Sequence, residues 1–444
     1  MGKALLVYRF AQEQLVLWAK SSRRKPLIVR GARQVGKTWL VDRVGAATFG
    51  SVVKIDLEKR RDLHVHFGAN LDVRAILASL ELASGTRIVP GETLLFLDEI
   101  QACPRAILAL RYFYEQLPDL HVVAAGSLLE FALGEISVPV GRVQYLHLHP
   151  MTFREYLMGV GNAAAAEYAA EHPSTVGDGI QQQLLRELKT YFFVGGMPES
   201  VKAYRDTASL AEASRVQGEI IDWYRDDFSK YTPRVDRTCL DAVLLNVARQ
   251  VGERITYTRL DGAHTGPTNR RAFELLRKAC VLHKVSSSNP SGLPLGASTT
   301  GKRFKAALLD IGLLQNLCRV PMDRELAEDD LLAIYRGRMA EQFVAQELVA
   351  CHSPGLFYWS REARSSNAEV DYLVVRDGQI VPIEVKSGTG GSLRSLRLLL
   401  DTYPNCSEGV VLYSGTYGQI PEQSLTFLPL YYAGATADPR PDIA

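Results

Sequence analysis

Short apolar runs alternate with amphipathic segments over the first third of the chain. The apolar runs occupy residues 26–30, 51–57, 93–98, 121–127 and 143–149. Between them, segments such as 74–83 and 105–117 carry apolar residues at the spacing of one helix face. Strands that are separated by helices are typical of a parallel sheet covered by helices. The pattern therefore predicts an α/β domain over residues 1–157.

The pattern changes after this domain. Residues 158–235 are mostly helical in pattern and predict a helical extension. The Ala- and Gly-rich stretch 159–180 interrupts it, and we expect a loop there. Residues 236–286 predict two or three short helices and then a strand. The Ser-, Pro- and Gly-rich stretch 287–301 predicts a loop or wing.

A second α/β pattern begins near residue 337. It predicts strands and helices in an order that differs from the first domain, at residues 337–350 (helix), 356–360, 369–375 and 380–386 (strands), 392–401 (helix) and 409–414 (strand). We expect this unit, within residues 306–435, to have its own core. The region 236–305 between it and the helical extension is then a third, smaller part.

Composition and charge agree with a globular protein of two or three domains. The 444 residues are 47% hydrophobic and 23% charged, and the net charge of +2 is too small to indicate nucleic acid by itself. Six scattered cysteines without a C-x-x-C spacing favour reduced thiols and a cytoplasmic location. No uninterrupted apolar run of about 18 residues occurs, so we expect no membrane partner.

A phosphate-binding loop motif begins at Gly31. Residues 31–38, GARQVGKT, match G-x-x-x-x-G-K-[ST] between a predicted strand and a predicted helix start. Glycines let the backbone wrap so that its N–H groups face phosphate oxygens, and the helix start adds its positive end. We expect Lys37 to contact the β- and γ-phosphates and Thr38 to ligate Mg²⁺. The predicted nucleotide contacts are Gly31, Ala32, Arg33, Gln34, Val35, Gly36, Lys37, Thr38 and Trp39. The alternative is a glycine loop that fits the motif by accident.

An acidic pair ends the predicted strand 93–98. Asp98 and Glu99 follow four apolar residues, at the carboxyl edge where ligands bind in such sheets. We expect Asp98 to hold the Mg²⁺ ion and Glu99 to act as general base on the attacking water. A surface Asp-Glu pair is the alternative. The acidic pair favours hydrolysis, and the absence of an N-K-x-D motif favours ATP over GTP.

Two further polar residues belong to the predicted catalytic set. Ser127 ends the predicted strand 121–127, where its side chain could sense the γ-phosphate. Arg142 follows Gly141 and could supply positive charge to the phosphate of a neighbouring subunit, as an arginine finger. The alternative for Arg142 is an ordinary surface arginine. A finger that acts in trans implies a homo-oligomer, for example a hexamer.

These motifs resemble a large group of prokaryotic AAA+ ATPases that carry a C-terminal domain of unknown function with a nuclease-like core. The resemblance rests on GARQVGKT, LLFLDEIQ, the Gly141-Arg142 step, HPMTFREY and FFVGGMPES, in the order of the family. It implies a three-layer P-loop AAA+ domain with Walker A at 31–38 and Walker B at Asp98 and Glu99. It also implies that Ser127 is sensor 1, that Arg142 is the trans-acting finger, and that a winged helix follows the ATPase module.

Positive charge gathers in the middle region. Residues 248–305 contain eleven Lys and Arg residues against three Asp and Glu residues. Residues 236–305 also fit a winged helix, with 267–279 as its recognition helix. A local basic surface on such a fold is typical of a DNA contact. The residues expected to bind DNA are Asn269, Arg270, Arg271, Arg277 and Lys278. A solvated helix face, or a winged helix that packs against the ATPase module, is the alternative.

The C-terminal region places acidic residues on successive predicted elements. Glu384 and Lys386 share one face of a strand because side chains alternate. Asp371 on the preceding strand could share a Mg²⁺ ion with Glu384, and Lys386 could steady the developing phosphate charge. Spacing and element order resemble the PD-(D/E)XK nuclease core, which is the fold of restriction endonucleases. That resemblance maps the metal ligands onto Asp371 and Glu384, with Glu341 as an accessory acid. Such cores also serve as inert DNA-binding or assembly domains.

The sequence therefore predicts a chain with three functional parts: an AAA+ ATPase, a basic winged helix and a nuclease-like α/β domain. The favoured function is ATP hydrolysis, with ATP and Mg²⁺ as cofactors, that drives binding, remodelling or translocation on branched or broken DNA. One alternative is a metal-dependent DNA nuclease that the ATPase gates. Another is a nucleotide-dependent protein-interaction switch in a defence or toxin-control system.

Overall fold

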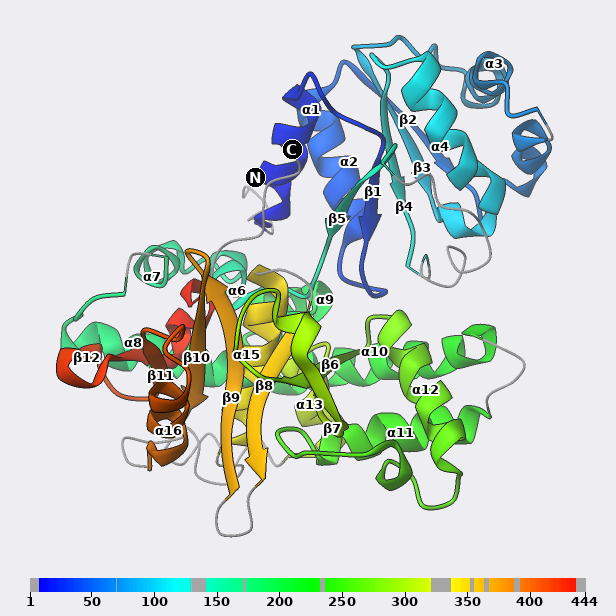
Figure 1. Ribbon diagram of the computed structural model, residues 1–444. Coiled ribbons are helices and arrows are strands. Elements are labelled where there is room, and N and C mark those ends of the chain that lie inside the picture. The colour runs from blue at the N-terminus through cyan, green and yellow to red at the C-terminus, as the bar shows by residue number, and fades with distance from the viewer. Residues whose placement is uncertain are drawn as a thin grey trace. The chain divides into compact units, whose positions relative to one another are not determined.

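The chain folds into two compact units, Tyr8–His149 and Pro150–Arg440 (Figure 1). The computed structural model describes residues 8–68, 70–127, 129, 141–170, 173–231, 236–320, 337–351, 355–362, 367–386 and 392–436. The first unit ends eight residues before the boundary expected at residue 157. Helix α6 (Phe153–Gly159) therefore belongs to the second unit.

The first unit contains a five-stranded parallel sheet in the order β2-β3-β4-β1-β5. The five apolar runs of the sequence form these strands, with bounds β1 Leu27–Arg30, β2 Ser51–Asp56, β3 Thr93–Asp98, β4 His121–Ala125 and β5 Gln144–His147. The prediction of a parallel α/β sheet is confirmed. Because the strands are parallel and Leu97 is paired with Ala124, the carboxyl ends of β3 and β4 meet at one edge.

Helices cover this sheet, and their ends follow local rules. Helix α3 (Val73–Ser84) begins where the Asp72 carboxylate accepts from two backbone N–H groups, and it ends at Gly85 in the left-handed region. Helix α4 (Pro104–Gln116) carries proline in its first turn, where no N–H partner is needed. The remaining helical elements are α1 (Ala11–Lys20), α2 (Lys37–Thr48), η1 (Arg61–Phe67) and η2 (Ile100–Ala102).

The second unit contains helices that lie before and between its strands. Their bounds are α7 (Ala163–Tyr168), α8 (Asp178–Val194), α9 (Pro198–Thr207), α10 (Leu210–Tyr231), α11 (Arg237–Arg249), η3 (Tyr257–Arg259), α12 (Gly266–Lys278), α13 (Ile311–Cys318), α15 (Arg338–Cys351) and α16 (Arg394–Thr402). None of the described helices is long and apolar enough to cross a membrane.

The expected loop at 159–180 is wrong in part. Helix α7 lies inside it, and helix α8 starts before its end. The physical reason is the run of four alanines, the residue type with the highest helix propensity, after Asn162. The Asn162 side chain caps the helix by accepting from the backbone N–H of Ala165.

The second unit also contains an eight-stranded sheet in the order β12-β13-β11-β10-β9-β8-β6-β7. Its strands are β6 (Leu282–Ser288), β7 (Thr299–Leu308), β8 (Leu356–Glu362), β9 (Asn367–Arg376), β10 (Gln379–Val385), β11 (Gly409–Tyr413), β12 (Gly418–Ile420) and β13 (Leu425–Pro429). Strand β6 pairs with β7 on one side and with β8 on the other. The boundary expected between residues 305 and 306 falls inside β7, so the hairpin of the middle region continues the C-terminal sheet (Figure 1).

Candidate functional site

The loop between β1 and α2 has the backbone of a phosphate-binding loop. Gly31 and Gly36 have φ angles of 143° and 91°, values that residues with a side chain rarely adopt. A Cβ atom on Gly31 would lie 2.1 Å from the carbonyl oxygen of Leu148. Ala32 and Val35 are buried, so they can offer a ligand only their backbone groups. The loop is therefore compact and ends at a helix start, which is the arrangement that binds phosphate.

Lys37 lies over this loop. Its side chain is buried, and Nζ donates to the carbonyl oxygens of Gly31, at 3.0 Å, and Ala32, at 2.7 Å. These contacts hold the ammonium group at the centre of the predicted phosphate contacts. Trp39 is part-exposed at 38%, which leaves its ring accessible to a ligand.

Thr38 and Asp98 lie side by side, as the sequence predicts for two ligands of one ion. Oγ1 of Thr38 is 3.3 and 3.1 Å from the two carboxylate oxygens of Asp98. Burial raises the pKa of Asp98, whereas the hydrogen bond from Thr38 and the charge of Lys54 lower it. A hydroxyl and a carboxylate are oxygen ligands of the kind that Mg²⁺ prefers. These two residues therefore fit a magnesium ion.

Glu99 follows Asp98 in a left-handed backbone conformation, with φ of 48°. Its Oε2 accepts a hydrogen bond from Nε2 of Gln101 at 2.5 Å. Gly126 makes room for this amide, since a Cβ atom there would lie 2.2 Å from Oε1 of Gln101. Gln101 thus positions the predicted general base. Gln101 is not among the predicted site residues, although it stands only two residues after Glu99.

Ser127 is brought to the same edge of the sheet. It lies two residues after β4, the strand between β1 and β3. Its Oγ accepts a hydrogen bond from Nε of Arg33 at 3.3 Å, so the loop and the predicted sensor are in direct contact. The structure thus gathers the loop, the acidic pair and Ser127 at one edge of the sheet.

Arg142 lies at the opposite edge. It precedes β5, and the pairing of Leu27 with Gln144 places it near the level of the residues that precede β1. The distance along the strands to the phosphate loop is about 20 Å, from roughly six residues at about 3.3 Å each. Its guanidinium group pairs with Glu115 at 3.0 Å, which also pairs with Arg111. Arg142 therefore does not reach the nucleotide site of its own chain.

Arg9 supports the loop from the N-terminal side, and no local pattern in the sequence indicates this role. The side chain is buried at 3% exposure. Nη1 donates to the carbonyl oxygen of Val35 at 2.8 Å, and Nη2 donates to that of His149 at 2.5 Å. Hydrogen bonds from a charged donor are stronger than neutral ones. Arg9 thereby links Val35 in the loop to His149, which lies two residues after the end of β5.

A basic pocket lies between α12 and the β6–β7 hairpin, with a volume of about 930 Å³. Five cationic side chains and two aromatic rings line it: Arg270, Arg271, Lys284, Lys302, Arg303, Tyr257 and Phe304. Nζ of Lys284 is 4.7 Å from the ring centre of Phe304 and donates to the Tyr257 hydroxyl at 3.1 Å. Phe304 is buried and Tyr257 is partly exposed, so Tyr257 is the ring that a base could reach, and the cations around it suit phosphates.

The structure corrects part of the predicted DNA-binding set. Asn269 has no exposed surface, and its Nδ2 donates to the carbonyl oxygens of Tyr257 and Asp261. It fixes the turn before α12 and cannot contact DNA. Arg277 pairs with Glu274 at 2.7 Å, and neither Arg277 nor Lys278 lines the basic pocket. Arg270 and Arg271 do line it. The pocket also contains Lys284, Lys302 and Arg303, which the sequence analysis counted only as local charge.

The predicted nuclease-like set places Glu341 on α15, Asp371 on β9 and Glu384 on β10, with Lys386 directly after that strand. The backbone N–H of Val385 donates to Oδ2 of Asp371 at 2.9 Å, and Nζ of Lys386 is 2.5 Å from Oε1 of Glu384. Burial raises the pKa of Glu341 to about 8 and that of Glu384 to about 7, with repulsion from Asp371 as the second cause for both. The structure brings these four residues together, but the prediction missed two members of the cluster: Glu369 on β9 and a cation from β7.

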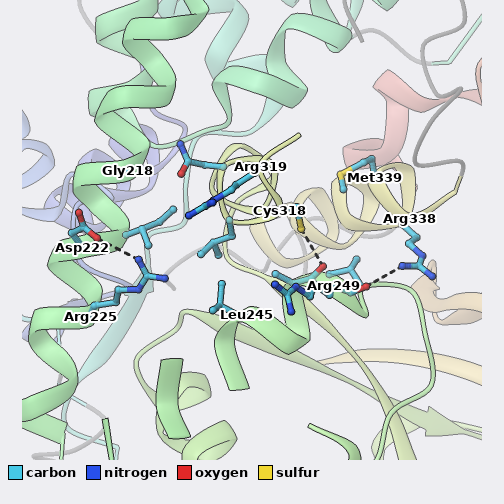
Figure 2. Close-up of a pocket in the computed structure, with 14 residues that line it drawn as sticks. Gly218, Asp222, Arg225, Leu245, Arg249, Cys318, Arg319, Arg338 and Met339 are labelled. Carbon is cyan, nitrogen blue, oxygen red and sulfur yellow. Dashed lines mark hydrogen bonds and ion pairs between the residues drawn. The ribbon is translucent and has the colours of Figure 1, made fainter. Parts of the chain in front are cut away.

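A second pocket, of about 680 Å³, lies among α10, α11, α13 and α15 (Figure 2). Four arginines line it, namely Arg225, Arg249, Arg319 and Arg338. Nε of Arg225 pairs with Asp241 at 2.6 Å, and Nη1 of Arg338 donates to the carbonyl oxygen of Arg249 at 2.9 Å. The excess of guanidinium groups suits an anionic group. No local pattern in the sequence indicates this pocket, because its arginines come from separate elements.

Comparison with known proteins agrees with the geometry of the nucleotide site. Residues 23–157 match the model of an AAA domain. Residues 185–324 and 336–432 match two domains of unknown function, DUF8612 and DUF4143. None of the curated proteins matches the sequence.

Several solved structures resemble the chain at low identity. The Walker-type ATPase PABY2304 of Pyrococcus abyssi is 14% identical, with a TM-score of 0.45, over 70% of this chain and 96% of that one. The Orc1 protein of Aeropyrum pernix in complex with DNA is 13% identical, with a TM-score of 0.29, over 71% and 92%. The RuvB Holliday junction branch migration motor of Thermotoga maritima is 16% identical, with a TM-score of 0.30, over 62% and 89%.

Proposed function

Because residues 23–157 form an AAA-type P-loop ATPase domain, we propose that the protein hydrolyses ATP to drive binding, remodelling or translocation on DNA. The site around Lys37, Asp98 and Glu99 supports the hydrolytic part. The observation that carries the DNA part is the basic pocket, where five cationic side chains surround two aromatic rings. The same chemistry recognises single strands and distorted duplexes, in which bases are accessible for stacking.

Each residue of the nucleotide site has a role in this proposal. The loop N–H groups and Lys37 bind the β- and γ-phosphates. Thr38 and Asp98 hold Mg²⁺, which neutralises phosphate charge when bound. Glu99, oriented by Gln101, accepts the proton of the attacking water. Ser127 donates its hydroxyl hydrogen toward the γ-phosphate while it accepts from Arg33.

We infer further that the active form is a homo-oligomer. Arg142 lies at the edge of the sheet opposite to its own phosphate loop, so it can act only on the nucleotide of another subunit. Its pairing with Glu115 leaves the side chain 46% exposed and available to a neighbouring copy. A finger supplied in trans contributes about 10³- to 10⁵-fold to hydrolysis in other P-loop enzymes.

The element order around the basic pocket supports a winged helix. Helix α11 is followed by a one-pair bridge at Ile255, by η3, by α12 and by the β6–β7 hairpin. The bridge joins Ile255 to Phe304 on β7, as the first strand of a winged helix joins the last. In this proposal α12 and the hairpin hold the sugar-phosphate backbone through Arg270, Arg271 and Lys302.

The test measures the ATPase rate of the full chain with single-stranded, duplex, nicked and four-way-junction DNA, and checks for cut products in the same reactions. We expect at least one DNA form to change the rate several-fold, with an effect that weakens as salt rises. The triple variant Arg270→Ala, Arg271→Ala, Lys302→Ala should keep the basal rate and lose the response. A rate that no DNA changes would instead favour the protein-interaction switch. Cutting that needs a divalent metal and is lost in Glu384→Gln would favour the gated nuclease.

A further inference from the structure

A buried lysine lies inside the acid cluster of the second unit. Lys305, on β7, is 2% exposed. Its Nζ is 3.0 Å from Oε2 of Glu341, 2.6 Å from Oε1 of Glu369 and 3.1 Å from Oδ1 of Asp371. An ammonium group has three N–H donors, and three carboxylates accept them. We propose that the ammonium group of Lys305 is a built-in cation that takes the place of the divalent metal of nuclease-like cores, so that this unit holds DNA without cutting it.

The charges of the cluster are nearly balanced without a metal ion. Four carboxylates belong to it, and three side-chain cations pair with them: Lys305, Lys386 with Glu384, and Arg254 with Glu369. Buried carboxylates need such partners, since an unpaired buried charge is costly. The acids in turn keep Lys305 protonated, because they raise its pKa even though burial lowers it.

A metal ion does not fit the arrangement of Asp371 and Glu384. One oxygen of Asp371 accepts from the ammonium of Lys305, and the other accepts from the backbone N–H of Val385. One oxygen of Glu384 pairs with Lys386, and the other is buried with no hydrogen-bond partner among the described residues. Both oxygens of Asp371 therefore already have donors, and an ion that shared Oδ1 with the ammonium group would be repelled by it strongly at low dielectric constant.

The position of Lys305 is set by the main chain. Its neighbour Phe304 exchanges two backbone hydrogen bonds with Ile255, and Lys305 itself is paired with Val285 of β6. Strand β7 also carries Lys302 and Arg303 into the basic pocket. One strand therefore supplies cations to the basic pocket and closes the acid cluster. The exclusion of a metal ion concerns residues of the second unit alone and does not depend on the ATPase proposal, whereas the statement that this unit holds DNA rests on the proposed function.

The test titrates Mn²⁺ into nucleotide-free full-length protein and follows free Mn²⁺ by electron paramagnetic resonance. All proteins carry Asp98→Asn, so that the nucleotide site does not bind the ion. We expect no site tighter than about 1 mM in this parent protein. Lys305→Met keeps the unbranched apolar stem but lacks the terminal ammonium group, and we expect it to gain one Mn²⁺ per chain with at least tenfold tighter binding. Adding Asp371→Asn should abolish the gained site. Lys302→Met, on the same strand, should bind no more Mn²⁺ than the parent.

Two results would overturn the proposal. The first is tight Mn²⁺ binding by the parent that Asp371→Asn removes. The second is folded Lys305→Met protein that binds no Mn²⁺. Should Lys305→Met fail to fold alone, the double variant Lys305→Met, Glu341→Gln removes one acid with the lysine, and Mn²⁺ should raise its melting temperature but not that of the parent. A double variant without this rise would also contradict the proposal.

Discussion

The hydroxyl group of Thr38 donates to the carboxylate of Asp98, with oxygen distances of 3.1 and 3.3 Å. This contact joins the first turn of α2 to the end of β3, although 60 residues separate the two in sequence. The fold therefore holds the two predicted magnesium ligands in contact with each other. Preorganised ligands need little rearrangement during the reaction, which is the condition under which electrostatic stabilisation is most effective.

Replacing the loop lysine should stop hydrolysis. In Lys37→Met the contact with the β- and γ-phosphates is lost, so we expect the ATPase rate to fall by about 10²-fold or more. The measurement is steady-state phosphate release with saturating Mg²⁺ and ATP. Lys20→Met, an exposed lysine at the end of α1, should retain the parent rate. Equal rates for Lys37→Met and the parent would contradict the assignment of the site.

Variants of Glu99 and Gln101 should lower the rate of ATP hydrolysis without weakening ATP binding. Glu99→Gln removes the general base, so we expect about a 10²- to 10³-fold lower kcat while ATP still binds. Gln101→Ala leaves the carboxylate but removes its hydrogen bond, and we expect a smaller loss, about tenfold in kcat, with KM little changed. Fluorescent-nucleotide binding and kcat are measured on the same preparations. A loss of ATP binding without a loss of kcat would show that these residues bind the nucleotide and do not take part in hydrolysis.

Mixing two inactive proteins should restore activity if the finger works between subunits. Arg142→Ala keeps its own nucleotide site, whereas Lys37→Met keeps its finger. We therefore expect each protein alone to be strongly impaired and an equimolar mixture to regain part of the parent rate. Arg111→Ala, which removes the other partner of Glu115, is the matched control and should remain active. Full activity of Arg142→Ala alone would show that Arg142 is an ordinary surface arginine and not an arginine finger.

The residues of α12 should divide into DNA contacts and structural residues. Arg270→Ala with Arg271→Ala should weaken DNA binding at least tenfold and lower its salt dependence. Arg277→Ala, whose side chain pairs with Glu274, should bind within about twofold of the parent. Asn269→Ala should lower the melting temperature, because two buried carbonyl groups lose their donor. Binding anisotropy and thermal unfolding would distinguish the three, and equal DNA affinity for all of them would contradict the proposed pocket.

A buried glutamate predicts a pH dependence of stability. Glu347 accepts from the backbone N–H of Phe153 at 2.8 Å, and burial raises its pKa to about 8 from the usual 4.5. Between these two pH values the folded chain binds more protons than the unfolded chain, so the free energy of unfolding falls as pH rises.

The variant Glu347→Gln removes this titration. Its melting temperature should be close to that of the parent near pH 5 and several degrees higher near pH 8. Glu422→Gln, at an exposed position, should follow the parent at both pH values. A difference between Glu347→Gln and the parent that is constant across pH would show that Glu347 stays ionised in the folded chain.

The first unit could be predicted well because its signals are local. Each of its strands is a short apolar run, and the phosphate loop is defined by consecutive residues between a strand and a helix. Arg9 escaped prediction because its role depends on the carbonyl groups of Val35 and His149, which only folding brings together.

In the second unit, the important contacts join residues that are far apart in sequence, and a local pattern cannot predict them. Lys305 looked like one more positive charge of the middle region, and its acid partners Glu341 and Asp371 are 36 and 66 residues away. The pairing of β6 with β8, for example of Val285 with Leu356, is not indicated by any pattern within either strand. Asn269 had the polarity of a DNA contact, but the turn that precedes α12 required its amide group.

Strand β6 is hydrogen-bonded along both sides, to β7 and to β8. A gene fragment that starts after β7 would leave β8 with a bare row of backbone groups, and such edges promote aggregation. Replacing the hairpin without the strands beside it would expose the same edge. The basic pocket and the acid cluster therefore depend on one continuous sheet for their stability.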